Sequence, residues 1–300
     1  MVKFPPSLTA GDKVMIVSPA GKVDSEIVYK AQQTLAGWGL DPIISAHALC
    51  DYGRFAGRRE ERLSDLQEAL LNPAVKAIFC ARGGYGAVQL IEDLPVEVIR
   101  NNPKWLIGYS DITLLHALFS RSGIVSLHAP MAQQLGCAPE DEISQMIRNI
   151  LFGGVPSYTI SGHDLNRIGY AEGQLVGGNL AVLSGLHGSS YDFIYDGSIL
   201  FIEDIGESPY KIERMLYNLR LAGVFDRING LVVGQFSDCT EDPLMNHTIY
   251  ENIRDLVNGY LFPVCFNFPC GHVAFNVPLP EGAKTILEVR PRDAHLRFIK

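Results

Sequence analysis

Short apolar runs punctuate the first half of the chain and are separated by longer amphipathic stretches. Runs of four or five apolar residues suit strands that are buried on both faces of a sheet. They predict strands at 14–17, 42–45, 76–80, 105–108 and 124–127. Because helical patterns alternate with these strands, we expect an α/β fold whose N-terminal domain has a parallel sheet covered by helices on both faces.

Two of the amphipathic stretches carry clear helix signals. Asp24 stands where an N-cap belongs, ahead of apolar residues at helical spacing up to about residue 37. The stretch 58–71 predicts a charged helix in which Leu63, Leu66 and Leu70 face inward. The pattern therefore indicates strand–helix–strand units from the start of the chain.

The second half of the chain begins a new series of elements. Pro209 occupies a favourable first-turn position for a helix, and residues 285–289 and 295–299 predict a closing hairpin. The stretch 153–171 is rich in glycine and polar residues and is interpreted as a linker between domains at 1–152 and 172–300. We expect a C-terminal α/β domain with a mixed sheet. Its remaining strands are predicted at 173–176, 198–202, 228–233 and 264–268.

Composition narrows the class of protein. The 300 residues are 47% hydrophobic and 19% charged, with a formal net charge of −8, which is typical of a globular protein. No basic run exceeds Arg58-Arg59, so no nucleic-acid partner is expected. No apolar run is long enough to span a membrane, and the N-terminus has no signal-peptide core. The six scattered cysteines suit a reducing cytoplasm.

Ser110 lies where the apolar run 105–108 meets the next predicted helix, with no loop between them. A side chain on such a turn points over the carboxyl edge of the sheet, and the first helical amides can stabilise an oxyanion. Gly108 and Ser110 match the nucleophile elbow Gly-x-Ser-x-Gly, but Ile112 replaces its last glycine. Two interpretations stay open, a nucleophile or an ordinary helix N-cap.

A glycine-rich loop, Arg82-Gly-Gly-Tyr-Gly86, follows the strand predicted at 76–80 and precedes a helix expected from Ala87. Glycines let the backbone approach a ligand and present its N–H groups. The spacing fits neither a dinucleotide fingerprint nor a P-loop, so no nucleotide cofactor is expected. The loop is a candidate oxyanion hole, with a tight turn of no function as the alternative.

Glu203 follows the apolar run 198–202, where a carboxylate could orient an imidazole. Asp204 and Glu207 compete for that role, and a carboxylate here could instead cap the helix that opens at Pro209.

His272 lies in a loop after the run 264–268, where an imidazole could be mobile enough for proton transfer. It is one of eight histidines, most of which are expected to be structural, and Cys270 is a weaker candidate nucleophile. The spacing of histidines and acidic residues matches no zinc motif, so no metal is expected. The order serine, glutamate, histidine is one that hydrolase triads use.

Taken together, these blocks resemble the LD-carboxypeptidase family of serine peptidases, which also includes microcin-immunity hydrolases. The resemblance runs through nearly the whole chain. It rests on Gly11-Asp-Lys-Val with Val17-Ser-Pro-Ala-Gly21, Ala81-Arg-Gly-Gly-Tyr-Gly86, Ile107-Gly-Tyr-Ser-Asp-Ile-Thr113, Leu175-Val-Gly-Gly-Asn-Leu180, Phe201-Ile-Glu-Asp-Ile-Gly-Glu207 with Tyr210-Lys-Ile-Glu-Arg214, and Gly271-His272.

The resemblance implies a catalytic triad of Ser110, His272 and Glu203. It also implies an oxyanion hole formed by the backbone amides of Asp111 and of a glycine in the Arg82 loop, for which Gly84 is preferred to Gly83.

The typical substrate of this family is a murein tetrapeptide, cut between the L-centre of a diamino acid and the terminal D-Ala. The resemblance therefore implies a cytoplasmic carboxypeptidase of peptidoglycan recycling that is a homodimer and needs no cofactor. Arg82, Gly83 and Tyr109 are its expected substrate-binding residues, with Arg82 as a partner for the substrate carboxylate.

Two other functions are compatible with these blocks. One is hydrolysis of aminoacyl-nucleotide antibiotics, as in the microcin-immunity branch, whose members tend to be longer and to supply aromatic residues for the nucleobase. Here the two tryptophans, Trp38 and Trp105, are both distant from Glu203 in sequence. The other is a non-catalytic peptide-binding relative, against which stands the presence of the serine, glutamate and histidine together.

Overall fold

The first half of the chain builds a six-stranded sheet with the strand order β11-β5-β4-β3-β1-β2. The structure is a computed structural model that describes residues 2–300. Neighbouring strands in this sheet are parallel except β11, which pairs antiparallel with β5. The strands are β1 (Lys13–Val17), β2 (Asp41–Ile44), β3 (Val75–Cys80), β4 (Trp105–Gly108), β5 (Ser126–His128) and β11 (Leu279–Glu281).

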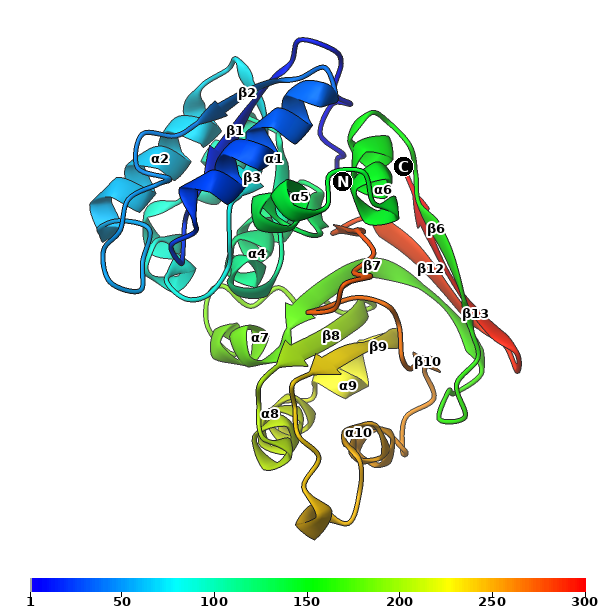
Figure 1. Ribbon diagram of the computed structural model, residues 1–300. Coiled ribbons are helices and arrows are strands. Elements are labelled where there is room, and N and C mark those ends of the chain that lie inside the picture. Colours follow the sequence, from blue (N-terminus) through cyan, green and yellow to red (C-terminus); the bar gives the residue numbers. More distant parts are fainter. Residues whose placement is uncertain (1) are drawn as a thin grey trace. The chain divides into compact units, whose positions relative to one another are not determined.

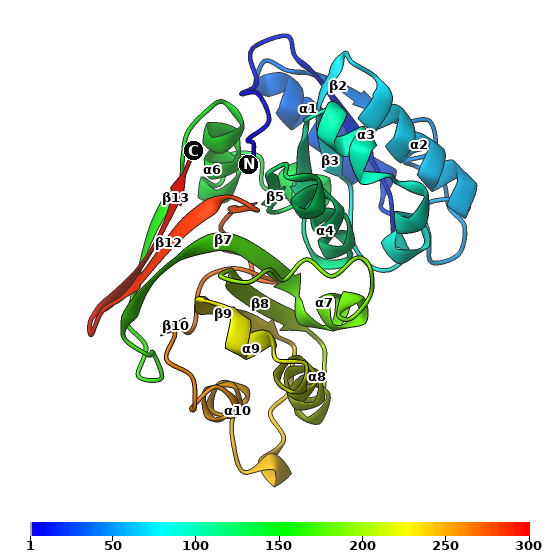
Figure 2. The same ribbon diagram turned by 180° about the vertical axis from the view of Figure 1, so that it is seen from behind.

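Helices cover both faces of this sheet, as the alternating pattern predicts. Helices α1 and α5 lie on the face seen in Figure 1, and α2 and α3 lie on the opposite face, seen in Figure 2. Asp24 caps α1, because its carboxylate accepts the N–H of Glu26 at 2.8 Å. The helices are α1 (Ser25–Gly37), α2 (Arg59–Leu71), α3 (Val96–Asn101), α4 (Thr113–Ser122), α5 (Ala132–Cys137) and α6 (Glu142–Leu151).

The strand order places a topological switch between β1 and β3. The chain runs from β1 outward to β2 on one side, and β3, β4 and β5 then follow on the other side. Open α/β sheets bind ligands at such a point, beyond the carboxyl ends of the strands. The loops after β1 and β3 meet there, since the N–H of Gly21 donates to the carbonyl of Gly83 at 2.9 Å.

The second half builds a seven-stranded mixed sheet in the order β10-β9-β8-β7-β12-β13-β6, which confirms the predicted fold class. Strands β10, β9, β8 and β7 are parallel, and β7, β12, β13 and β6 continue as an antiparallel ribbon. The ribbon is long and curved in Figure 1. The strands are β6 (Ser157–Ser161), β7 (Gly169–Asn179), β8 (Ile199–Ile205), β9 (Gly230–Ser237), β10 (Val264–Cys265), β12 (Lys284–Val289) and β13 (Asp293–Ile299).

Pro209 occupies the first turn of α8, where its missing N–H costs no hydrogen bond. Gly223 has φ 73°, a left-handed conformation that lets the chain turn directly after this helix. The helices of this half are α7 (Leu180–Leu186), α8 (Pro209–Leu221), α9 (Val224–Arg227) and α10 (Ile249–Leu256).

The backbone divides into two compact units. The first contains the chain up to Val155 together with Val277–Gly282, and the second contains Pro156–Asn276 and Ala283–Lys300. Strand β6 lies within the stretch 153–171 that the sequence suggests as a linker. Strand β11 belongs to the first unit because it pairs with β5, although it comes late in the sequence.

Three local predictions are wrong. The helix expected from Ala87 is a pair of 3-10 turns, η1 (Ala87–Gln89) and η2 (Ile91–Asp93). The strand expected at 264–268 forms sheet bonds only at Val264–Cys265. In α2, Arg62 and Asp65 are buried while Leu63 is half-exposed, because both polar side chains bond to loops distant in sequence.

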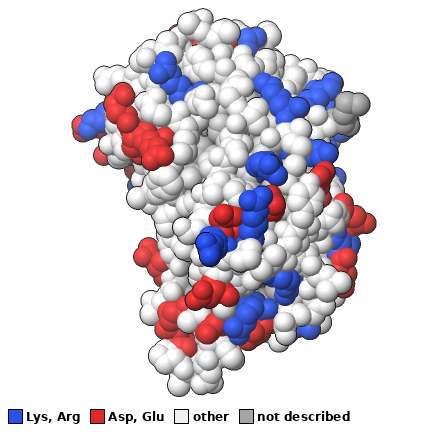
Figure 3. Space-filling model, turned by 90° about the vertical axis from the view of Figure 1, so that its right-hand side faces the viewer, with Lys and Arg blue, Asp and Glu red and all other residues white. Residues whose placement is uncertain are grey.

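The surface carries charges of both signs. On the face shown in Figure 3, basic and acidic side chains are interspersed, and most of the surface between them is uncharged. Across residues 2–300, every helix is too short or too polar to cross a bilayer.

Candidate active site

Ser110 has φ 66°, a left-handed conformation that few residues other than glycine adopt. Tyr109 alone separates it from β4, and it opens the 3-10 turn η3 (Ser110–Ile112), which continues into α4. Ser110 is not an N-cap, since the N-cap of η3 is Tyr109 and the N-cap of α4 is Ile112. The N-cap interpretation of Ser110 is therefore wrong, and the strained turn is that of a nucleophile elbow.

The departure from Gly-x-Ser-x-Gly at Ile112 has a packing explanation. A β-carbon added at Gly108 would lie 2.9 Å from Cγ1 and Cγ2 of Ile112. The isoleucine side chain thus fills the space beside Gly108, and only a glycine there allows the turn to fold back this closely. The single remaining glycine of the motif suffices for the strand-to-helix turn.

Gly83 lies against Ser110. A β-carbon on Gly83 would be 2.9 Å from Cβ of Ser110, 3.1 Å from its Oγ and 3.4 Å from the amide nitrogen of Asp111. Gly84 comes next, with φ 104° and an exposed position. The structure therefore brings together the Arg82–Gly86 loop, the serine and the first amide after it, all within the first unit.

Arg82 and Tyr109, two of the expected substrate-binding residues, also lie in this half of the chain. Arg82 is exposed, and its Nη1 donates to the carbonyl of Lys22 at 2.9 Å. Tyr109 is buried; its hydroxyl accepts a hydrogen bond from Nε2 of Gln134 at 2.8 Å, and its ring packs edge-on against His128. Arg82 is thus exposed to solvent, while Tyr109 supports the turn from within.

In the second unit, His272 and Glu203 form a hydrogen-bonded pair. Nδ1 of His272 lies 2.7 Å from Oε2 of Glu203, whose side chain is fully buried, while the imidazole keeps 13% of its surface exposed. A carboxylate on Nδ1 fixes the ring orientation and directs Nε2 outward, and it stabilises the imidazolium when the ring takes up a proton. A pair of this kind has the chemistry that a general base and its orienting acid require.

A bulge in the sheet places Glu203. The register of β8 against β9 shifts between Ile202 and Asp204, which is the segment that carries Glu203. Bulges of this kind redirect side chains near active sites. Gly234 in β9 fits closely there, since a β-carbon on it would be 2.7 Å from Cys270 and 3.2 Å from Cβ of Glu203.

The loop that carries His272 is fixed on both sides. The carbonyl of Cys270 accepts the N–H of Gln235 at 2.9 Å, and the N–H of Gly271 donates to Oδ1 of Asn276 at 2.9 Å. Gly271 has φ 118°, and a β-carbon on it would be 2.8 Å from Oε2 of Glu203. Glycine is required at 271 both for the backbone conformation and for the close approach to the carboxylate.

The competing carboxylates have other partners. Asp204 accepts the N–H of Ala181 and Nδ2 of Asn179, each at 2.9 Å, and burial raises its pKa to about 6. Glu207 lies 3.4 Å from the Lys211 ammonium. Glu203 is thus neither a helix cap nor interchangeable with these neighbours.

Cys270 is a poor nucleophile in this setting. Its side chain is fully buried, and burial together with the nearby Glu203 charge raises the pKa of the thiol well above its usual range. Because the thiolate is the reactive form, the alternative of a cysteine nucleophile has no support.

Among residues 2–300, one group combines metal-ligating side chains. Ligand atoms of His116, His128 and Glu281 lie within 4.8 Å of one another, and all three residues are buried. Nδ1 of His116 is 2.7 Å from Oγ of Ser126, and its Nε2 is 2.9 Å from the carbonyl of Gly108. Burial lowers the pKa of His116 to about 4, so its ring is neutral. With both ring nitrogens bonded to the protein, His116 serves as a brace beneath the β4 turn.

The matches to family models cover most of the chain. The N-terminal domain of the LD-carboxypeptidase family matches residues 14–129, and its C-terminal domain matches residues 172–287.

Individual relatives agree with this assignment. A probable murein peptide carboxypeptidase of Bacillus subtilis is 32% identical, covering 97% of this chain and 93% of the relative. The murein tetrapeptide carboxypeptidase of Pseudomonas aeruginosa is 30% identical, covering 92% and 93%. The crystal structure of a muramoyltetrapeptide carboxypeptidase from Oxalobacter formigenes superposes with a TM-score of 0.88 at 29% identity, covering 96% of this chain and 99% of that one.

The sequence match to a microcin-immunity protein is shorter. The microcin C7 self-immunity protein of Escherichia coli is 29% identical, but the match covers 78% of this chain and 77% of that protein. Both family models, the relatives and the shared fold indicate the same family. The chain belongs to the LD-carboxypeptidase family of peptidases.

Proposed function

We propose that this protein is a serine carboxypeptidase that removes the terminal D-Ala from murein tetrapeptides by cutting the preceding L,D bond. The observation that carries the proposal is the 2.7 Å contact between His272 Nδ1 and the buried Glu203 carboxylate. The left-handed turn at Ser110 supports it, because a hydroxyl on such a turn is presented for attack. The relatives named as murein peptide carboxypeptidases supply the substrate class.

In the proposed mechanism, Nε2 of His272 takes the proton from the Ser110 hydroxyl as its oxygen attacks the scissile carbonyl. Glu203 stabilises the imidazolium that forms, and His272 then gives the proton to the departing D-Ala amine. The oxyanion of the tetrahedral intermediate accepts hydrogen bonds from the amides of Asp111 and Gly84, with Gly83 as the other candidate donor. Water attacks the resulting acyl-enzyme while the same imidazole accepts its proton. The ester bond to Ser110 then breaks, and His272 returns the proton to the Ser110 oxygen.

The carboxylate of the terminal D-Ala needs a cationic or amide partner. Arg82 is proposed for that role, because it is exposed beside the glycine loop and a guanidinium can bind a carboxylate through two hydrogen bonds. Gly83 is proposed to line the same region through its backbone, and the buried Tyr109 is proposed to act on this region through the turn that it supports.

Release of free D-Ala from a purified tetrapeptide tests the proposal. We expect the wild-type protein to release D-Ala and Ser110→Ala to lose turnover by several orders of magnitude while keeping its melting temperature. An aminoacyl sulfamoyl nucleotide is the competing substrate in a parallel assay. Cleavage of that compound without release of D-Ala would assign the protein to the microcin-immunity activity. An undiminished rate in Ser110→Ala would contradict the assignment of Ser110, His272 and Glu203 as a catalytic triad.

The cellular setting is part of the same proposal. We propose that the protein acts in the cytoplasm on recycled muropeptides and that it is a homodimer. The cysteines support a reducing compartment, since all six are free thiols in the part of the chain that the structure describes. Light scattering on the purified protein tests the dimer, and a monomer at micromolar concentration would exclude it.

A further inference from the structure

Asp111 contributes its backbone amide to the proposed oxyanion hole, and its side chain also makes a defined contact. The carboxylate is 3% exposed, and its Oδ2 accepts the N–H of Ala87 at 2.8 Å. The amide of Gly86 also stabilises the charge, more weakly. The residue directly after Ser110 thus bonds to the end of the Arg82–Gly86 loop.

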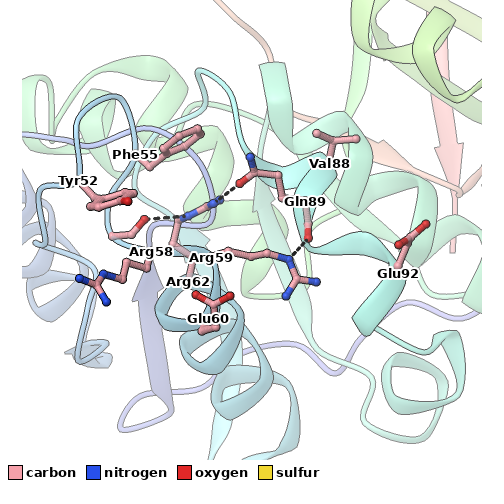
Figure 4. A pocket seen from close by; sticks show the side chains of 10 residues that line it. Tyr52, Phe55, Arg58, Arg59, Glu60, Arg62, Val88, Gln89 and Glu92 are labelled. Atoms are coloured by element: carbon pink, nitrogen blue, oxygen red, sulfur yellow. Dashed lines mark hydrogen bonds between the residues drawn. The ribbon is translucent and has the colours of Figure 1, made fainter.

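Arg62 also binds the end of the Arg82–Gly86 loop, through a backbone carbonyl. Its guanidinium is buried, and Nη1 donates to the carbonyls of Gly86 at 3.0 Å and Pro19 at 2.7 Å. A second nitrogen bonds to the Gln89 side chain, as Figure 4 shows. Gly86 has φ 136°, and a β-carbon on it would be 2.7 Å from Nη1 of Arg62, so the fit depends on glycine.

Figure 4 shows Arg62 among the side chains that line a pocket of about 690 Å³. The Arg62 guanidinium lies 4.9 Å from the centre of the Phe55 ring, and the Phe55 ring in turn lies 6.0 Å from that of Tyr85. The end of the glycine loop is therefore held by three segments. They are α2, the loop that precedes α2 in the sequence, and the turn after Ser110.

The start of the loop is fixed separately. The carbonyl of Gly83 accepts from Gly21, and Gly83 itself lies against Ser110. Gly84 lies between this anchor and the anchor at Gly86 and Ala87. A loop fixed at both ends can hold its amides in place before substrate arrives, which is what an oxyanion hole requires.

We propose that the Asp111 carboxylate is a positioning residue, which locks the Arg82–Gly86 loop onto the Ser110 turn and so sets the separation of the two oxyanion donors. The inference rests on the proposed function. One donor is the amide of Asp111 itself, and the other belongs to the loop that its side chain holds. A displacement of about 1 Å in such a site can cost about 100-fold in rate.

The contact has an electrostatic cost. Burial raises the pKa of Asp111 to about 6, against the opposing effects of the Ala87 amide and the Arg62 charge. The charged and titratable groups that face it are Arg62 from α2 and the Cys80 thiol from β3. Because the folded pKa lies above the unfolded value, the stability that Asp111 contributes is present at low pH and is lost as the pH rises through about 6.

A purely structural aspartate and a positioning aspartate therefore predict different results for Asp111→Asn. An amide can still accept the Ala87 N–H, but a hydrogen bond to a neutral acceptor is about half as strong. We expect kcat for D-Ala release to fall about tenfold with KM within about twofold, and Asp111→Ala to lose about 100-fold. At about pH 8 the melting temperature of Asp111→Asn is expected to equal or exceed that of the wild type, because no buried charge remains.

The pH profile adds a second readout. Below about pH 6, kcat of the wild type should fall more steeply than kcat of Asp111→Asn, because only the wild type loses the Asp111 charge that holds the loop. Arg62→Lys tests the other side of the loop and is expected to lower kcat in the same way.

Asp65→Asn is the matched control, since Asp65 is also 3% exposed and accepts from Ser45 Oγ and the His47 N–H, away from the glycine loop. It should lower the melting temperature and leave kcat unchanged. The rate at which a fluorophosphonate labels Ser110 gives a measurement that does not depend on the natural substrate, and Asp111→Asn should slow it about tenfold.

Asp111→Asn with wild-type kcat, labelling rate and pH slope would overturn the positioning role, as would a loss of activity that only follows a fall in melting temperature. Failure of the wild type to release D-Ala, with fluorophosphonate labelling still slowed in Asp111→Asn, would overturn the proposed substrate and leave the positioning role intact.

Discussion

His272 Nδ1 lies 2.7 Å from Glu203 Oε2, and the carboxylate is fully buried behind the imidazole. Burial strengthens this contact, because a charge in a low-dielectric site interacts more strongly than in water. Gly234 and Gly271 leave the space for it, and the bulge in β8 points the carboxylate into that space.

Removing the charge from Glu203 should disable the base while preserving the fold. Glu203→Gln keeps the size of the side chain but does not stabilise an imidazolium, and it can favour the wrong ring tautomer. We expect kcat for D-Ala release to fall by about 10²- to 10⁴-fold with little change in KM. Glu207→Gln is the control, since Glu207 pairs with Lys211 instead, and equal losses in the two variants would contradict the assignment.

Gly271→Ala should lower catalytic activity more than it lowers the stability of the fold. The added β-carbon would lie 2.8 Å from Glu203 Oε2, and φ 118° is unfavourable for alanine. We expect a loss of stability of about 1–3 kcal/mol and a much larger proportional loss of kcat. Gly206→Ala is the matched control, because Gly206 has φ 70° with nothing within 4 Å of its added carbon. If both variants lose the same fraction of kcat, the close approach to Glu203 is irrelevant.

Gly83→Ala should obstruct Ser110. The new methyl group would be 3.1 Å from Ser110 Oγ, so either the serine or the loop must shift. We expect about a 100-fold loss in kcat, larger than the accompanying fall in melting temperature would explain. Gly37→Ala adds a methyl group where nothing lies within 4 Å, within helix α1, and should leave activity intact and stabilise the helix by about 0.5–1 kcal/mol. Full activity in Gly83→Ala would argue against the packing of this loop on the serine.

His116 should make the protein sensitive to acid. Burial lowers its pKa to about 4 from 6.5, so the unfolded chain binds a proton there before the folded chain does. Its contribution to stability is therefore complete above about pH 6.5 and is lost as the pH falls towards 4, by at most about 3 kcal/mol. Urea unfolding of the wild type and of His116→Gln, across this range, measures the difference.

The wild type must be compared with His116→Gln because Asp111 and Asp204 change the stability with pH in the opposite direction to His116. Burial raises the pKa of each to about 6, so their contributions to stability increase as the pH falls below that value. Both aspartates are present in wild type and variant, and their effects cancel in the difference. A difference that stays constant from about pH 7 to about pH 4.5 would rule out His116 as the sensitive group.

Features that depend on neighbouring residues could be predicted from the amino-acid sequence. Apolar runs located β1, β3 and β4, Asp24 and Pro209 marked the starts of helices, and the absence of a loop between 105–108 and the next helix identified the turn at Ser110. These features follow from local periodicity, capping and backbone preference, which act over a few residues.

Features that depend on contacts between distant segments could not be predicted in this way and come from the folded chain. Local pattern left Glu203, Asp204 and Glu207 as alternatives, whereas the bulge against β9 and the approach of Gly271 select Glu203. In the same way, Arg62 is buried in place of Leu63 because the carbonyls of loops far away in sequence bind its guanidinium. A polar side chain is buried when its partners are in place, and those partners are fixed by strand order and loop packing rather than by the residues beside it.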